Sequence, residues 1–320
     1  MLMFFILLLS ELGNVLCIKY DNKFHYDLYE TTKLSGKNNL NETFFSSLES
    51  YQVDAQPVSE VQYPWVAKVI HSRSKHKPHM CTAVCIEKRI FITAARCIYS
   101  LKVKHTTVIY QQERLPALSF VVPSQGTKQA FDDIGFIVVE DGFTGIWKTI
   151  KLFESTNRTD DNFEWFVNLG LSGMGFKVVG YATQKGIHRI KAAEREFDLT
   201  ELEIKIDIKI CTTILTFNNR VNGFHVPCYH SCTLEQFKTN NKLCQKYHGV
   251  EGGAIIDIKT HKLLGVATWG PYFYKYELPV GFSVPNSDNF FKDYTCARHI
   301  RNDNSVLVMA GYYQSICDDI

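Results

Sequence analysis

The sequence predicts an all-β protein, and three observations carry that prediction. Short runs of β-type residues recur from about Tyr63 onward, and turn signals separate them. One run, EIKIDIKI (203–210), alternates strictly and places its isoleucines on one face, as a half-buried strand does. Helix-type periodicity is scarce, and the best helix candidate is one stretch near the C-terminus, 289–301.

Each predicted strand is a short run of apolar and β-branched residues. The runs are WVAKVI (65–70), RIFITAA (89–95), TTVIY (106–110), IGFIVVE (134–140), FKVVGY (176–181), EIKIDIKI (203–210), GAIIDI (253–258) and KLLGVATW (262–269). Runs of this length and spacing are typical of a β-sandwich or β-barrel. The 320 residues are enough for one large β domain or two smaller ones.

The charges are balanced, with 35 Lys and Arg residues against 33 Asp and Glu residues. No long run of a single sign occurs, so the sequence has no nucleic-acid footprint and no polybasic membrane segment. A hydrophobic fraction of 45% is ordinary for a globular protein and argues against general disorder.

The first residues suggest export. The apolar run 1–9 is shorter than the roughly 20 residues that span a bilayer, and no later stretch is long and apolar enough. We therefore predict a signal peptide over 1–17, cleaved after Cys17, and a secreted, extracellular protein. The alternative is a buried apolar N-terminus. Residues 18–51 are polar and without sustained period, so we expect a loosely ordered extension.

Ten cysteines fit an oxidising compartment. They are Cys17, Cys81, Cys85, Cys97, Cys211, Cys228, Cys232, Cys244, Cys296 and Cys317. In a secreted chain, cysteines are most simply disulfide partners. Loss of Cys17 leaves an odd number, so one thiol is free or pairs between chains, which gives a monomer or a disulfide-linked assembly.

Two further sequence features bear on the compartment. Asn41 and Asn157 begin N-x-[ST] sequons, which are glycosylation acceptors in secreted chains. A zinc site could be drawn from three cysteines and a nearby histidine. Its members would be Cys228, Cys232, Cys244 and either His230 or His248. Secretion favours disulfides instead, so we predict no metal and no cofactor.

Four segments, in order along the chain, carry the functional signal. They are YPWVAKVI (63–70), CTAVCIEKRIFITAARC (81–97), DDIGFIVV (132–139) and GVEGGAIIDIKTHKLLGVATWG (249–270). Together they resemble the chymotrypsin/trypsin (S1) family of serine proteases. That family shows Pro-Trp, then Cys-Gly-Gly-Ser-Leu-Ile leading to Thr-Ala-Ala-His-Cys, then Asp-Ile-Ala-Leu, Gly-Asp-Ser-Gly-Gly-Pro and Ser-Trp-Gly.

The resemblance implies a fold of two antiparallel six-stranded β-barrels with a short C-terminal helix. It places a trypsin-like domain over 52–320. Barrel 1 would span about 52–160 and barrel 2 about 161–300, followed by an extension over 301–320.

The resemblance also locates three triad positions. The histidine position is Arg96, the serine position is Glu251, and the aspartate is kept as Asp133. Guanidinium has a pKa above about 12 and cannot accept a proton at neutral pH. A carboxylate at the serine position is a poor nucleophile with no base beside it. We therefore predict that no catalytic residue is functional.

The family's activation machinery is absent from the sequence as well. The segment that aligns with the activation site, 51–55, has no basic residue before it. The family's aspartate before the catalytic serine, which pairs with the new N-terminus, is Val250 here. We therefore expect no zymogen switch. We also hypothesise that Arg96 lies between Asp133 and Glu251 and forms a charge-compensated cluster with both. The alternative is that Arg96 points to solvent.

Remnants of the family's substrate site are predicted at five positions. Gly249 holds the place of the oxyanion-hole glycine. The substrate-pairing strand corresponds to Thr268, Trp269 and Gly270, and Gly281 corresponds to a pocket wall. A peptide could add there as an extra strand. The bulky run after Pro271 alters or closes the pocket.

The resemblance implies some disulfide pairings and leaves others open. Cys81–Cys97 matches the family's first disulfide loop. Cys211 pairs with Cys228 or Cys232, and the remaining one could pair with Cys244. Because Cys296 and Cys317 lie outside the family pattern and close together, they are candidates for a mutual bond. Cys85 replaces a buried strand leucine or isoleucine and is nominated as the free, buried thiol.

Three functions compete. The resemblance implies a secreted protease homologue that binds proteins, with proteases or protease inhibitors as candidate partners, in an immune or reproductive fluid. The second is an active serine-type endopeptidase that uses non-standard residues, but no histidine occupies a matching motif. The third is a carbohydrate- or matrix-binding module on the same fold.

Overall fold

The computed structural model describes most of the chain between Gln56 and Asn302. The described residues are 56–72, 79–99, 101–123, 133–153, 172–182, 198–204, 206, 228–229, 251–269 and 280–302. They belong to one unit, Glu49–Ile320. The expected signal peptide, the extension over 18–51 and the sequons at Asn41 and Asn157 lie outside them.

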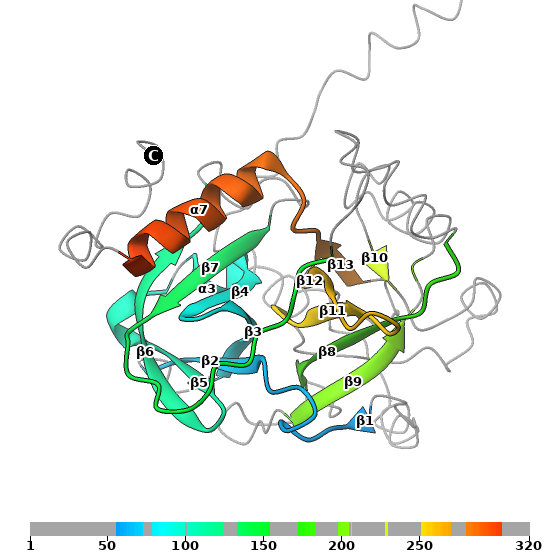
Figure 1. The fold of residues 1–320 in the computed structure, drawn as a ribbon, viewed down its shortest axis with the longest axis horizontal. Helices are drawn as coiled ribbons and strands as arrows, with labels where there is room; N and C mark the ends of the chain where they lie inside the picture. The colour runs from blue at the N-terminus through cyan, green and yellow to red at the C-terminus, as the bar shows by residue number, and fades with distance from the viewer. Residues whose placement is uncertain are drawn as a thin grey trace, which may run out of the picture. The chain divides into compact units, whose positions relative to one another are not determined.

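Six strands close into an antiparallel barrel (Figure 1). In spatial order they are β2 (Val66–His71), β3 (His79–Glu87), β4 (Ile90–Ala94), β7 (Ile134–Val139), β6 (Glu113–Val121) and β5 (Thr106–Tyr110). A single-turn helix, α3 (Ala95–Ile98), follows β4, and a short 3-10 turn (Val103–His105) precedes β5. Closure pairs every strand on both sides and removes the exposed sheet edges that invite aggregation.

Seven strands form a second antiparallel sheet. In spatial order they are β1 (Gln56–Pro57), β9 (Asp198–Ile204), β8 (Phe176–Ala182), β11 (Ala254–Asp257), β12 (Leu263–Trp269), β13 (Val280–Ser283) and β10 (Cys228–Tyr229). Two short segments that flank the barrel strands in the sequence also pair with this sheet. β1 pairs with β9, and Leu152 forms an isolated bridge with Leu263.

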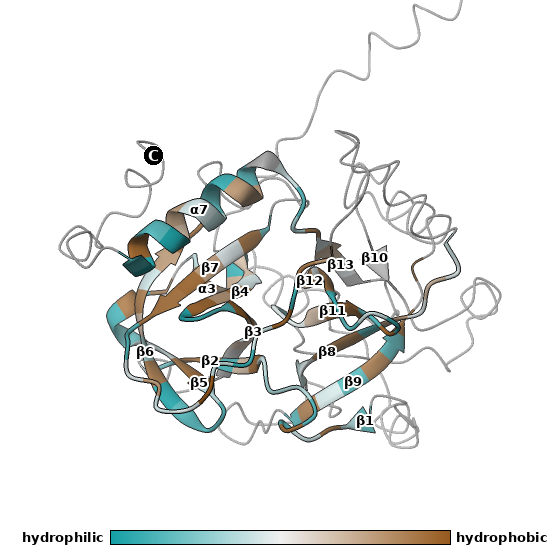
Figure 2. Ribbon diagram, in the orientation of Figure 1, coloured by the Kyte–Doolittle hydropathy of each residue, from teal (hydrophilic) through white to brown (hydrophobic). Residues whose placement is uncertain are grey.

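Some strands bury every second side chain, whereas others are buried on both faces. In β5, buried residues alternate with partly exposed ones, whereas all residues of β4 and β7 are buried. The hydropathy colouring shows these central strands as mostly hydrophobic (Figure 2). One apolar cluster fills the barrel, and a second joins residues of the barrel, the second sheet and the C-terminal helix.

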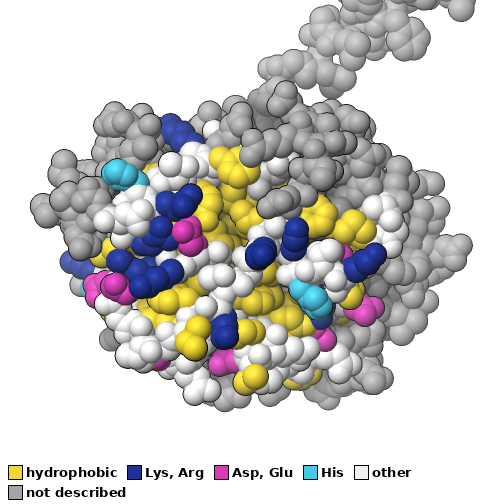
Figure 3. Space-filling view, in the orientation of Figure 1, with side chains coloured by type: hydrophobic (Ala, Val, Ile, Leu, Met, Phe, Trp, Pro, Cys, Tyr) yellow, Lys and Arg dark blue, Asp and Glu magenta, His cyan; other side chains and the backbone are white. Residues whose placement is uncertain are grey.

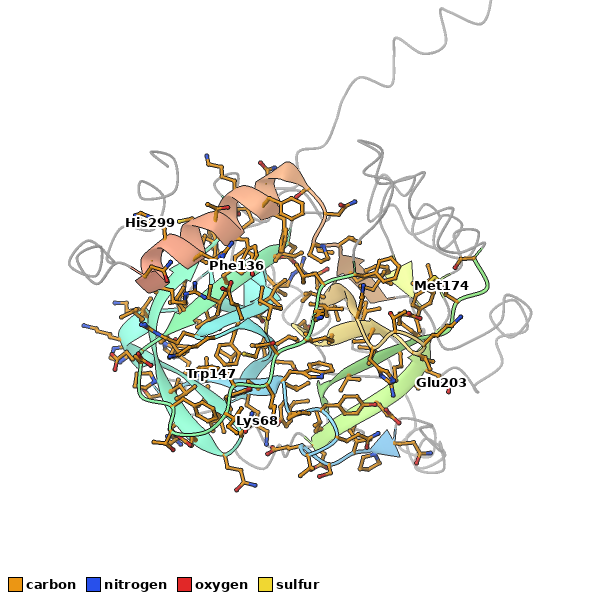
Figure 4. All side chains as sticks on the ribbon, viewed as in Figure 1. Lys68, Phe136, Trp147, Met174, Glu203 and His299 are labelled. Carbon is orange, nitrogen blue, oxygen red and sulfur yellow. A yellow bond between two sulfur atoms is a disulfide. The ribbon has the colours of Figure 1, made fainter. Side chains whose placement is uncertain are left out.

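The C-terminal helix α7 (Asp288–Asn302) packs on the barrel strand β7 (Figure 1). Phe290 lies 5.4 Å from Phe136 between ring centroids, and Phe136 points toward this helix (Figure 4). Polar contacts hold the far end of the helix. Arg301 forms a 2.6 Å ion pair with Glu87, and Tyr294 donates a 2.8 Å hydrogen bond to the same carboxylate. Lys and Arg side chains gather over this end of α7 (Figure 3).

The structure confirms the all-β class with a short C-terminal helix, and most predicted elements match closely. β5 has the predicted bounds, and α7 extends one residue beyond the prediction at each end. Two differences have physical reasons. The predicted strand 203–210 shares only its first two residues with β9, which runs from Asp198 to Ile204 because it pairs with all seven residues of β8. Most of the predicted run lies outside the described residues. β6 was not predicted because Pro116 interrupts its pattern, but barrel closure makes it a strand.

Among the described helices, none is long and apolar enough to cross a membrane.

Candidate functional site

The ends of two neighbouring barrel strands bring Arg96 and Asp133 together. β4 and β7 pair in register, with Ala94 opposite Ile134. Asp133 immediately precedes β7, and α3 begins immediately after β4. The backbone N–H of Ala95 donates to the carbonyl of Asp133 at 3.1 Å. The two residues that the sequence placed at triad positions therefore share one end of the barrel.

Two features hold the short helix α3 against the barrel. The disulfide Cys81–Cys97, with a Cα–Cα distance of 6.0 Å, ties the helix to β3. Gly135 of β7 lets the helix approach closely, because a Cβ there would lie 3.1 Å from the Cα of Ala95 and 2.9 Å from the Cδ1 of Ile98. Arg96 thus stands on a turn whose position is set by a covalent bond and a close packing contact.

The Arg96–Asp133 pair is bidentate. The backbone N–H of Arg96 donates to Oδ1 of Asp133 at 3.0 Å, and its side-chain Nε donates to Oδ2. The Asp133 side chain is fully buried and the Arg96 side chain is 21% exposed. Burial raises the pKa of the Asp133 carboxyl, and the charge and hydrogen bonds of Arg96 oppose that rise. Both carboxylate oxygens are therefore engaged by one residue.

In this arrangement a buried carboxylate holds a guanidinium. In a triad, the buried carboxylate fixes an imidazole that can accept a proton. Here it fixes a guanidinium, which stays protonated at every physiological pH. No general-base step can run through Arg96. The contact of Arg96 with Glu251 stays a prediction.

Glu251 begins a tight turn that docks on the barrel. Its carbonyl accepts a 2.8 Å hydrogen bond from the N–H of Thr82. Gly252 follows with a φ of +78°, and a Cβ there would lie 1.9 Å from the carbonyl oxygen of Thr82. The N–H of Gly252 donates to Ala267 of β12 at 2.7 Å. Only glycine fits this position, for both its backbone angle and its close approach.

A buried junction connects the barrel, the second sheet and this turn. We define the junction as Thr82, Thr93, Tyr181 and residues 251–253. Thr93 Oγ1 donates to the Thr82 carbonyl at 2.7 Å, and the Tyr181 N–H donates to Thr82 Oγ1 at 2.9 Å. Thr82, Thr93 and Tyr181 were not among the predicted site residues. One signal was available, because Thr82 stands where the family motif has the first glycine of Cys-Gly-Gly-Ser.

Of the predicted substrate-site remnants, the structure describes three. Trp269 pairs with Gly281 across β12 and β13, where the register shifts at Thr268. Thr268 is fully buried, and its hydroxyl donates to the Gly281 carbonyl at 3.3 Å. These three positions therefore meet on neighbouring strands. Gly249 and Gly270 lie outside the described residues.

The described cysteines agree with their predicted states. Cys81 and Cys97 form a disulfide, and Cys85 is a free, fully buried thiol. Burial raises the pKa of Cys85 to about 12. Cys296 on α7 is disulfide-bonded, and its predicted pairing with Cys317 stays a prediction. The bonding states of Cys211, Cys228, Cys232, Cys244 and Cys317 lie outside the described part.

Within the described ranges, no group of three His, Cys, Asp or Glu side chains could hold a metal ion. Of the alternative zinc ligands considered from the sequence, only the backbone of Cys228 falls in those ranges. The structure therefore does not test that alternative.

Comparisons with known proteins point to the same family as the sequence motifs. The family model "Trypsin" matches residues 52–163. The search of curated proteins returned no match.

Solved structures share the fold at low sequence identity. The inactivated protease paralogue S-D1 of the scabies mite is 16% identical, with a TM-score of 0.55 over 78% of this chain and 98% of that one. The mite paralogue S-I1 is also 16% identical, with a TM-score of 0.50 over 78% and 99%. The VesB protease of Vibrio cholerae is 16% identical, with a TM-score of 0.51 over 76% and 66%. The family match over residues 52–163 and the shared fold beyond them show that the chain has the trypsin-like fold and is similar to the S1 serine proteases.

Proposed function

We propose that the protein is a secreted, catalytically inactive trypsin-like homologue that acts by binding another protein. Its role would be that of a regulator or cofactor in an extracellular protease pathway, with a protease or a protease inhibitor as partner. The observation that carries the proposal is the bidentate pair of Arg96 with Asp133.

The chemical argument rests on what each triad position can do. The Arg96 guanidinium cannot serve as a base, and it occupies the carboxylate that would orient one. Glu251 supplies no hydroxyl at the nucleophile position. In triad enzymes, loss of one member costs orders of magnitude in rate, and the losses are not additive. The mite proteins with this fold are named inactivated protease paralogues, which supports the same interpretation.

The proposed site has a second part that favours binding. Thr268, Trp269 and Gly281 lie on neighbouring strands of the second sheet, where the family pairs with substrate backbone. We propose that Arg96, Asp133 and Glu251 form a charge-compensated cluster beside them. A scaffold of this kind keeps a shaped surface and lacks the reacting groups. Peptide addition as a strand remains compatible with it.

A covalent fluorophosphonate probe tests inactivity. The secreted chain is expected to remain unlabelled at concentrations that label trypsin completely in the same tube. Heat-denatured chain is the control for nonspecific attachment. Labelling of one serine in the native chain, absent after denaturation, would establish the active-endopeptidase alternative instead.

Crosslinking mass spectrometry in the native extracellular fluid tests the partner class. The expected crosslinks join the trypsin-like domain to a protease or a protease inhibitor. Exclusive recovery with polysaccharide or matrix material would favour the carbohydrate-binding alternative. The intact mass of the secreted chain tests export, since cleavage after Cys17 makes Ile18 the first residue.

A further inference from the structure

Thr82 uses three of its polar groups to join elements from both sheets. Its N–H donates to Glu251 O at 2.8 Å, and its hydroxyl oxygen accepts the N–H of Tyr181 at 2.9 Å. Its carbonyl accepts the hydroxyl of Thr93 at 2.7 Å. Thr82 is fully buried, so each of these bonds forms away from solvent, where an unsatisfied partner is costly.

The hydroxyl contributes a contact that the family's residue could not make. The family motif has glycine after the first cysteine, whereas this chain has Thr82 after Cys81. Glycine would keep the backbone bonds and lose the bond to Tyr181. The pairing of β8 with β11 ends at Val179, two residues before Tyr181. The Thr82 side chain therefore binds the β8 backbone beyond the end of that ladder.

The same residue also limits the movement of the turn that carries Glu251. Gly252 approaches the Thr82 carbonyl so closely that no Cβ could be accommodated. The turn is bonded on its other side to β12, since the N–H of Ala267 donates to Gly253 at 2.8 Å. Thr82 and β12 thus hold the turn from opposite sides, and the Thr82 hydroxyl adds a bond to β8 beyond the β8–β11 ladder.

We propose that Thr82 is a positioning residue that holds the turn 251–253 and the end of β8 in one conformation without N-terminal cleavage. In the family that the chain resembles, cleavage frees a new N-terminus that pairs with the aspartate before the catalytic serine. This sequence has Val250 at the aspartate position and no basic residue in the stretch SSLES (46–50) immediately before 51–55. A buried neutral hydrogen bond needs neither a cleavage nor a charge. The proposal holds whether the protein cuts or binds.

Hydrogen exchange measured on the full secreted chain tests the proposal. In the uncleaved wild type, the amides of Tyr181, Gly252 and Ala267 are expected to be protected. Thr82→Val keeps the side-chain shape and removes the acceptor of the Tyr181 N–H. Exchange at these three amides is expected to accelerate on the order of tenfold or more. The amides of the β5–β6 hairpin are expected to keep their wild-type rates.

Thr200→Val is the matched control. Thr200 is also a buried threonine, and its hydroxyl donates to Gly180, the neighbour of Tyr181, from within the same sheet. This variant is expected to leave Gly252 and Ala267 at wild-type rates. Thr82→Ser retains the hydroxyl and is expected to behave as wild type. If Thr82→Val does not fold, Thr82→Ala replaces it in the same comparison.

Three results would overturn the proposal. One is an uncleaved wild type whose Gly252 and Ala267 amides exchange as in a free peptide. Another is a Thr82→Val variant with unchanged rates, or with rates raised equally in the β5–β6 hairpin, which would mark a purely global loss of stability. The third is a Thr200→Val variant with the same pattern as Thr82→Val.

Discussion

At the scale of the residue, the chemistry of this molecule depends on which side chain lies beside the Asp133 carboxylate. The buried carboxylate receives a backbone N–H and a side-chain N–H from the same residue, Arg96. A guanidinium satisfies the carboxylate electrostatically and cannot take up a proton. At this position the guanidinium of Arg96 therefore stabilises the charge of the Asp133 carboxylate.

Removal of the guanidinium should be strongly destabilising. In Arg96→Met, the fully buried Asp133 carboxylate loses its charge partner, and the free energy of unfolding at pH 7 should fall by about 3–5 kcal/mol. Urea unfolding measures this loss. In Arg96→Met combined with Asp133→Asn, the neutral amide should recover most of it. A single variant within about 0.5 kcal/mol of wild type would show that the pair contributes nothing.

The Cys85 thiol should be inert in the folded protein. Its side chain is fully buried and its pKa is raised to about 12, so very little thiolate exists at pH 8. Iodoacetamide at pH 8 is expected to leave Cys85 unmodified in the native chain and to alkylate it in urea. Peptide mass mapping reads out both states. Native alkylation at the rate of a small free thiol would contradict the burial.

At the scale of the element, α7 is attached to the barrel by an apolar face and a polar clamp. Its rings pack on Phe136, and Glu87 of β3 receives Arg301 and Tyr294. Burial alone would raise the pKa of Glu87. The hydrogen bonds from Arg301 and Tyr294 and the charges of Arg301 and Arg298 outweigh it, so the pKa lies below its usual value.

The clamp should weaken in acid. Because the folded pKa of Glu87 lies below the unfolded value of about 4.3, the ionised group stabilises the fold above that pH. The contribution is lost as the pH falls through the folded pKa. Glu87→Gln should therefore flatten the dependence of stability on pH below about pH 5. Glu203→Gln, on an exposed position of β9, is the control. Equal flattening in both variants would contradict the clamp.

At the scale of the whole molecule, the barrel and the second sheet meet at the junction around Thr82. Polar groups there come from β3, β4, β8 and the turn 251–253, and an apolar cluster surrounds them. Backbone approaches at such a place leave no room for ordinary side chains.

Gly252→Ala should disrupt this junction. The new Cβ would lie 1.9 Å from the Thr82 carbonyl oxygen, on a residue whose φ is +78°. Backbone strain and overpacking together predict a loss of at least about 3 kcal/mol in urea unfolding. Gly173→Ala is the matched control, because Gly173 also has a positive φ, +64°, but open space around it. Similar losses in both variants would show that strain alone matters and that the close approach does not.

Much of the fold was predictable because it depends on local patterns in the sequence. Alternating or fully apolar runs marked seven of the described strands and the end of β9, and the ordered motifs located Arg96, Asp133 and Glu251. β6 escaped because Pro116 breaks its local pattern, and its identity as a strand comes from its pairing with β5 and β7. Short elements such as β1 and β10 carry too few residues for any period to show.

The sequence by itself determined the fold class, the family resemblance and the residue types at the triad positions, because these depend on composition, period and order. Only the tertiary structure decided that Arg96 binds Asp133 and that Glu87 holds α7. It also decided that Thr82 joins two sheets. Each of these contacts links residues distant in the chain, and no local pattern encodes which buried polar groups will meet when the strands close. The physical requirement that buried donors and acceptors find partners is met only in three dimensions.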